Sequence, residues 1–286
     1  MGVYTNSMPY AHIVKPGSSV KLKDLDPSDH GGLEKEEADF RRHEMGQRVE
    51  EMQELMYAAS KNSLLIVLQG CDTSGKDGSI KGILNYVNVQ SCRVASFKQP
   101  THIEQAHDYL WRVHEQTPAL GGMTIFNRSH YEDVLVVRVH DYVPKSVWKK
   151  RYEQINQFEE LLSDSGTIIL KFFLHISKDE QEKRLLARED DADKAWKLSV
   201  ADWSERELWK DYQKAFTDAL ENCSTAFAPW HIVPSNHKWF RDVAIMEALE
   251  NTLKPYKQGW HEHLKEIGVA RKKELEEYRQ KMKIKA

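Results

Sequence analysis

Short apolar runs alternate with amphipathic stretches along the middle of this chain. The apolar runs have the length of β-strands and lie near 63–69, 93–97, 123–127, 167–175 and 230–234. The stretches between them have helical spacing and predict helices over 76–87, 102–116, 144–163, 178–189, 202–221 and 237–254. Such alternation is typical of βαβ units, so the pattern predicts an α/β fold with a mainly parallel sheet and helices on both faces.

The two ends of the chain differ from this alternating core. Residues 1–31 are rich in turn formers, and 33–59 have the pattern of a charged helix that packs alongside the core. The strongly charged stretch 259–282 predicts a terminal helix that is either solvated or faces another subunit of a homo-oligomer. We therefore expect an N-terminal extension over 1–59, a core over 60–256 and a C-terminal helix over 257–286.

Composition narrows the classes of protein that this chain can represent. Its 41 Lys and Arg nearly balance its 44 Asp and Glu, which argues against a nucleic-acid binder that works by bulk charge. No run approaches the ~18 apolar residues of a membrane span, and the N-terminus lacks the pattern of a signal peptide. Three scattered cysteines predict a reduced, cytoplasmic setting with neither disulfides nor a zinc site.

The first apolar run leads into a glycine-rich loop. Gly70, Gly75 and Lys76 have the spacing of a Walker A motif, in which backbone N–H groups at a helix N-terminus bind phosphate. Asp77 stands where that motif has Ser or Thr, and Gly78 follows it. The motif predicts a phosphate-binding loop whose lysine adds a positive charge. An ordinary strand–turn–helix with a capping Asp is the alternative.

Asp72 lies inside this anion-binding loop. A carboxylate there repels phosphate unless a divalent cation lies between them. The sequence therefore predicts that Asp72 is a magnesium ligand, directly or through water.

A polar cluster follows the third apolar run. Asn127, Arg128 and His130 come where that strand ends, and ligands of open α/β sheets bind at the carboxyl ends of strands. We expect this cluster to face the phosphate loop, with Arg128 binding phosphate oxygens in bidentate fashion. A polar turn that caps the next helix is the alternative.

Basic residues surround a polar connection between two helices at 183–212. Helix, mobile basic loop and helix is the construction of a phosphate-transfer lid, which closes to exclude water. Interspersed acids allow the alternative of a solvated, salt-bridged surface. The expected polyanion contacts of the lid are Arg184, Arg188, Lys194 and Lys197.

The second strand and the helix after it supply further candidates. Lys98 and Thr101 follow the strand, and Lys98 and Arg112 could reach the crevice. The candidate nucleotide contacts are Thr101, Glu104, Asp108, Arg112, Asn127, Glu132 and Arg138.

Together these segments resemble the polyphosphate kinase 2 family from about residue 21 to residue 256. The matching motifs are Lys23-Asp-Leu-Asp-Pro27, Gly70-x-Asp72-x-x-Gly75-Lys-Asp-Gly78, Ser96-Phe-Lys-Gln-Pro100, His107-Asp-Tyr-Leu-Trp-Arg112, Phe126-Asn-Arg-Ser-His-Tyr-Glu-Asp-Val-Leu-Val-Val-Arg-Val-His140 and Trp196-Lys-Leu-Ser199. Departures are Cys71, Thr73 and Ser74, where the family has small apolar residues.

This resemblance implies a P-loop kinase fold of three layers, similar to thymidylate kinase, with a helical lid. It also implies phosphate transfer between inorganic polyphosphate and nucleotides with Mg2+, which Asp72 and Asn127 would hold. Asn127, where the family more often has Asp, resembles the subgroup that phosphorylates both AMP and ADP. The sequence leaves open the choice between AMP and ADP and the use of guanine nucleotides. The competing hypotheses are an ATP-dependent kinase of the same fold and a non-catalytic binding protein.

Overall fold

A six-stranded sheet lies at the centre of the computed structural model, which describes residues 9–190 and 200–285. The strands are β1 (His12–Ile13), β2 (Ser63–Gln69), β3 (Cys92–Ser96), β4 (Met123–Asn127), β5 (Thr167–His175) and β6 (Trp230–Pro234), in the spatial order β1-β6-β5-β2-β4-β3. All neighbouring pairs are parallel except β1 with β6. The predicted α/β fold with a mainly parallel sheet is therefore confirmed.

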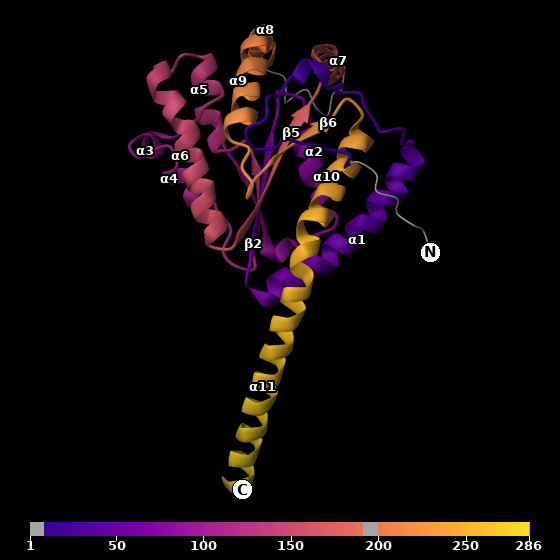
Figure 1. Ribbon diagram of the computed structural model, residues 1–286, viewed down its shortest axis with the longest axis vertical. Helices are drawn as coiled ribbons and strands as arrows, with labels where there is room; N and C mark the ends of the chain where they lie inside the picture. The colour runs from indigo at the N-terminus through magenta and orange to yellow at the C-terminus, as the bar shows by residue number, and fades with distance from the viewer. Residues whose placement is uncertain (1–8, 191–199, 286) are drawn as a thin grey trace.

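Helices cover the sheet on both faces and form three layers (Figure 1). The first face carries α1 (Lys35–Ala59), α2 (Lys76–Leu84) and α10 (Lys238–Leu253), and the second carries α6 (Lys145–Asp164) and α9 (Trp209–Asn222). The remaining helices are α3 (His102–Gln105), α4 (Trp111–His114), α5 (Val136–Val139), α7 (Lys178–Glu189), α8 (Val200–Glu207) and α11 (Lys257–Lys285), with 3-10 turns at Leu22–Asp24, Val89–Ser91, His130–Asp133 and Lys254–Tyr256.

The central strand β2 explains why an apolar run predicts this fold. Leu64, Ile66 and Leu68 pack into the core under the first face, whereas Leu65 and Val67 pack into the core under the second. All five are 0% exposed. Burying side chains of this kind contributes about 1.5–3 kcal/mol each, so the strand that leads into the glycine-rich loop is firmly held between the two layers.

Two predicted helices are interrupted in the structure. The helix expected over 102–116 is divided into α3 and α4, because the Asp108 carboxylate accepts the N–H groups of Leu110 and Trp111 and so starts a new turn. The helix expected over 202–221 is divided at Leu208 into α8 and α9. The sequence prediction also missed β1, whose two residues are too few to produce a pattern.

The C-terminal helix α11 projects from the body of the molecule (Figure 1). Trp260 anchors its first turns, since it is 1% exposed and donates its indole N–H to Asn62 Oδ1 at 2.9 Å. Farther along, Val269 and Tyr278 are 70% and 60% exposed. The subunit contact expected for this helix, and the division of the chain into extension, core and terminal helix, stay predictions. Among the described residues, no helix combines the length and apolar character needed to cross a bilayer.

Candidate active site

The glycine-rich loop joins β2 to α2 with three residues in the left-handed backbone region. Gly70, Thr73 and Gly75 have φ values of 155°, 63° and 107°. A Cβ at Gly70 would lie 2.9 Å from the carbonyl oxygen of Leu174 and 2.7 Å from Ser74 Oγ, so glycine is required there. The turn closes through a hydrogen bond from the Ser74 N–H to the Cys71 oxygen at 3.1 Å, and α2 begins at Lys76. This is the strand–loop–helix geometry in which backbone amides bind phosphate.

Lys76 lies within the loop. Its ammonium group donates to the carbonyl oxygens of Gly70 at 2.8 Å and Cys71 at 3.2 Å, and the residue is 8% exposed. Burial, followed by the nearby charge of Arg128, lowers the pKa of Lys76 below its ordinary value. A phosphate would therefore be a favourable additional partner, since it supplies negative charge to a partly desolvated cation.

Arg128 connects the loop to the end of β4. It has a positive φ of 62°, and its guanidinium lies 2.6 Å from Asp72 Oδ1 and 3.3 Å from Glu132 Oε2. Burial opposes the charged form of Arg128, but the nearby carboxylates of Glu132 and Asp72 outweigh it and raise the pKa of Arg128 above its ordinary value. Beside this pair, Asn127 Nδ2 donates to Asp77 Oδ1 at 2.9 Å, which ties the end of β4 to the first turn of α2.

A buried polar network supports the segment that carries Arg128. Lys171 Nζ lies 2.5 Å from Glu159 Oε2 and donates to Tyr131 Oη at 2.8 Å and to the Cys223 carbonyl at 2.6 Å. His130 Nε2 is 3.1 Å from Glu159 Oε1, and both side chains are 0% exposed. His130, expected among the phosphate contacts, therefore lies in the core beneath the site.

Three cavities meet at Arg128, which lines all of them, and two of the three also include residues of the loop. The first, the basic cavity, has a volume of about 460 Å³. Among the described residues, its charged lining has six cations and two carboxylates: Lys76, Arg128, Arg184, Arg188, Lys238 and Arg241 against Asp72 and Asp77. An excess of positive charge beside a phosphate loop suits a ligand with repeated negative charges.

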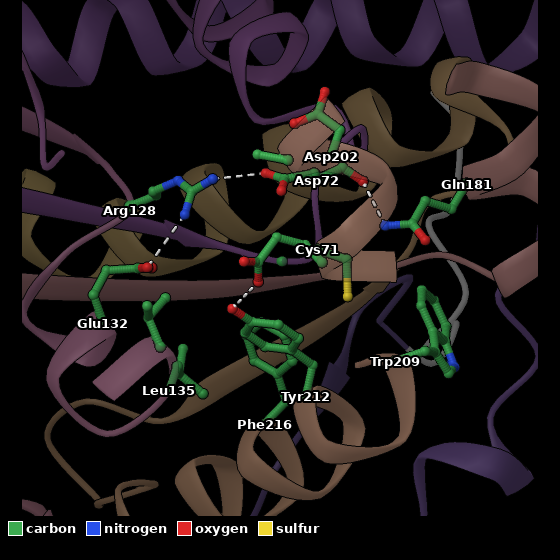
Figure 2. Close-up of a pocket in the computed structure, with 14 residues that line it drawn as sticks. Cys71, Asp72, Arg128, Glu132, Leu135, Gln181, Asp202, Trp209, Tyr212 and Phe216 are labelled. Carbon is green, nitrogen blue, oxygen red and sulfur yellow. Dashed lines mark hydrogen bonds and ion pairs between the residues drawn. The ribbon is translucent and has the colours of Figure 1, made fainter. Parts of the chain in front are cut away.

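The second, the central cavity, has a volume of about 270 Å³ and is drawn in Figure 2. Arg128 lies between Asp72 and Glu132, while Trp209, Tyr212 and Phe216 supply aromatic surface (Figure 2). The further acidic residues Asp202 and Glu205 come from α8. Burial, and then repulsion by Asp72, raises the pKa of the Asp202 carboxyl.

The third, the side cavity, has a volume of about 880 Å³ and reaches from Arg128 toward β3 and α5. Lys98, Arg112 and Glu132, which the sequence singled out, line it together with apolar residues such as Phe97 and Val137. Mixed apolar and polar walls of this size are typical of small-molecule sites.

Several other predicted contacts have local partners in the structure. Thr101 and Glu104 form the capping box of α3, and Asp108 caps the turn before α4. Arg138 pairs with Asp218 at 2.7 Å and stacks on Trp148, beside a different cavity. Lys194 and Lys197 lie outside the described residues, as does the centre of the lid expected over 183–212.

Lys238 and Arg241, at the start of α10, line the basic cavity but were absent from the predicted set. The signal that could have found them is positional, because they follow β6 and ligands of parallel sheets bind beyond the carboxyl ends of strands. Gly75 suits its position because its φ is 107°, and a Cβ there would also lie 1.9 Å from Arg241 Nη1.

The carboxylates that the described residues bring to the site are not grouped as ligands of one metal ion. Within residues 9–190 and 200–285, no group of three or more His, Cys, Asp or Glu side chains is placed to hold a metal ion. Mg2+ commonly binds through one or two carboxylates together with water and substrate phosphates, so Asp72 at the mouth of the phosphate loop fits such an ion.

A mainly parallel sheet, a phosphate loop and a basic cavity at the strand ends define a P-loop kinase fold. The profile of the family described as Polyphosphate kinase 2 (PPK2) matches residues 32–259. An AMP/ADP-polyphosphate phosphotransferase of Meiothermus ruber is 48% identical over 242 residues, or 84% of this chain and 91% of that protein. An ADP-polyphosphate phosphotransferase of Rhodopseudomonas palustris is 41% identical over 248 residues, 82% and 84% of the two chains.

Solved structures agree with the sequence comparison. The crystal structure of polyphosphate kinase 2 from Arthrobacter aurescens TC1 has 38% identity and a TM-score of 0.82, and the match covers 87% of this chain and 93% of that one. This chain belongs to the polyphosphate kinase 2 family. The resemblance predicted from the motifs is confirmed.

Proposed function

We propose that this protein transfers a phosphoryl group from inorganic polyphosphate to AMP and ADP, with Mg2+, in a reversible reaction. The observation that carries the proposal is the position of Arg128, which lines both the basic cavity beside the phosphate loop and the larger side cavity. The relatives named above act on the same classes of substrate, since one is called an AMP/ADP- and another an ADP-polyphosphate phosphotransferase.

The basic cavity suits the donor. Polyphosphate carries negative charge along its length, and Lys76, Arg188 and Lys238 are among the cations that line this cavity. The loop amides and Lys76 would hold the phosphate that is transferred, where charge redistributes during the reaction. Little covalent work falls to the protein, so positioning and charge neutralisation supply the rate.

The side cavity suits the acceptor. Its volume can take a nucleoside, and Lys98 and Arg112 lie in its walls. Arg112 is already held by the Lys98 carbonyl at 2.8 Å, so its guanidinium is oriented before a ligand arrives. An acceptor phosphate would then lie near Arg128, where the two cavities meet. The phosphate of AMP or ADP is ionised at neutral pH and needs no strong general base.

Asp72 is the residue that would hold Mg2+, and Asn127 is a second candidate. Bound Mg2+ would neutralise charge on the oxygens of donor and acceptor phosphates. Arg128 is paired with Asp72, so it would help to fix the orientation of that carboxylate.

The test is a time course of AMP, ADP and ATP with polyphosphate and Mg2+ as the additions, and AMP as the starting nucleotide. We expect ADP and then ATP to appear without any added ATP, and Lys76→Ala to lower turnover by ~10²-fold or more. If ADP forms only when ATP is supplied, the protein is an ATP-dependent kinase of the same fold. If neither donor supports turnover, it is a binding protein.

A further inference from the structure

The guanidinium of Arg184, on α7, makes five hydrogen bonds to oxygens of the protein. Its Nε donates to Glu180 Oε1 at 2.7 Å, Nη1 to the carbonyls of Thr73 at 2.9 Å and Ser74 at 3.1 Å, and Nη2 to the carbonyls of Ser235 at 2.6 Å and Asn236 at 2.9 Å. A guanidinium has five N–H donors, and the residue is 9% exposed. Although Arg184 lines the basic cavity, its donors are therefore already committed to the protein.

These bonds fix the orientation of the phosphate loop. A peptide unit is planar and trans, so holding a carbonyl oxygen on one side directs the next residue's N–H to the opposite side. The bond to the Thr73 carbonyl thus directs the Ser74 N–H, which closes the turn onto Cys71. The bond to the Ser74 carbonyl directs the Gly75 N–H, at the N-terminus of α2, away from Arg184.

A neighbouring side chain acts on the preceding peptide unit. Gln181, one turn earlier on α7 and 3% exposed, donates to the Asp72 carbonyl at 3.3 Å (Figure 2). Three successive carbonyls of the loop, from Asp72 to Ser74, are therefore held from α7. Thr73 keeps a φ of 63°, which is unfavourable for a β-branched residue and requires such support.

The same guanidinium joins the loop to the end of β6. Asn236 is itself fixed, because its N–H donates to the Pro27 carbonyl at 3.0 Å and its Oδ1 accepts the Ser177 N–H at 3.0 Å. Arg184 thus connects the loop, α7 and the turn after β6, three segments that are distant in sequence.

We propose that Arg184 is a positioning residue, which shapes the phosphate loop from behind rather than gripping polyphosphate. Arg188, one turn farther along α7, differs in a way that makes it a matched comparison. It lines the same cavity, is 25% exposed at its side chain and pairs with Asp202 at 3.0 Å. The positive charge that holds the polyphosphate would then come from Arg188, whereas Arg184 would maintain the geometry of the loop.

Substitution by Lys and by Gln at both positions separates the two roles. Lysine keeps the charge but cannot reproduce a planar fork with five directed bonds. We expect Arg184→Lys to lower kcat by at least ~30-fold with a polyphosphate KM within about threefold of wild type, and Arg184→Gln to differ little from it. At Arg188 we expect charge to matter instead of shape. Arg188→Lys should change the kinetics little, whereas Arg188→Gln should raise the KM for polyphosphate. Because a positive charge is lost, kcat/KM of Arg188→Gln should also depend less on salt than that of the wild type. A near wild-type Arg184→Lys enzyme overturns the proposal.

Hydrogen exchange gives a readout that needs no catalysis, so it stands even if the proposed function fails. In folded Arg184→Lys protein, we expect amides of residues 70–76 to exchange at least ~10-fold faster, while those of β5 keep wild-type rates. In Arg188→Gln, residues 70–76 should be unchanged. Equal acceleration in the loop and in β5 would mean general destabilisation, and no acceleration in the loop would mean that Arg184 does not hold it; either result overturns the proposal.

Discussion

Arg128 Nη2 lies 2.6 Å from Asp72 Oδ1, so the cation expected to bind phosphate and the carboxylate expected to bind metal form one ion pair. Glu132 Oε2, at 3.3 Å, is a second carboxylate beside the same guanidinium. Binding of Mg2+ and phosphate would add an opposite charge to each partner. The pair can therefore remain in place while both ligands bind, which keeps the carboxylate and the guanidinium oriented throughout.

Replacing Asp72 by Asn should remove the charge that attracts Mg2+ while preserving the shape of the side chain. We expect most activity to be lost and the Mg2+ concentration for half-maximal rate to rise by ~10-fold or more. Titrating Mg2+ at saturating substrates measures this. Glu132→Gln is the matched variant, because Glu132 is the other carboxylate on Arg128, and it should shift the Mg2+ requirement much less. Equal shifts in both variants would assign the effect to Arg128 instead.

Replacing Asn127 by Asp should alter the choice of acceptor. Asn127 donates to Asp77 at 2.9 Å, so the substitution exchanges a hydrogen bond for two opposed carboxylates. The Coulomb energy of unit charges a few Å apart is about 4 kcal/mol at an effective dielectric of 20, enough to move the end of β4 relative to α2. The ratio of kcat/KM for AMP to that for ADP should change by ~10-fold or more. An unchanged ratio would place the determinant elsewhere, with Glu132 the next candidate.

Substitutions of Lys171 and Glu159 should have strongly coupled effects on the free energy of unfolding. Both side chains are 0% exposed and their charged atoms are 2.5 Å apart. Lys171→Met or Glu159→Gln alone leaves one buried group without its counter-charge, which typically costs about 3–5 kcal/mol. The double variant should lose less stability than the two single variants together, by at least ~1 kcal/mol in the free energy of unfolding measured with urea. Strict additivity would show that Tyr131 and the Cys223 carbonyl, not the pairing, carry the stability.

His231 should make stability depend on pH. Burial lowers the pKa of its imidazole to about 4, whereas an exposed histidine has a pKa near ~6.5. Between these values the unfolded chain binds a proton that the folded protein does not, so stability falls as the pH falls. His231 should contribute about 2 kcal/mol to the loss of stability from pH 7 to pH 5, and His231→Phe should lack this contribution. Unfolding by urea at both pH values checks this, and an equal slope in the variant would contradict it.

The fold and much of the site follow from local patterns. Apolar runs such as 63–69 are buried whichever partner strands they find, so the five main strands were predicted from the sequence. Gly70, Gly75 and Lys76 are neighbours in the chain, and their spacing alone determines a loop that can bind phosphate. The place of Arg128 at the site was also predictable, because it directly follows a strand whose end must lie at the same edge of the sheet.

What the tertiary structure decided is which partner each polar side chain takes. Arg184 and Arg188 look alike in sequence, one helical turn apart. Only the packing of α7 against the loop and the turn after β6 gives the first its four carbonyl partners, whereas the second pairs with Asp202. His130 likewise belongs to the strand-end cluster in sequence but lies in the core against Glu159. Hydrogen bonds between distant segments depend on positions and orientations in space, and a one-dimensional pattern does not contain them.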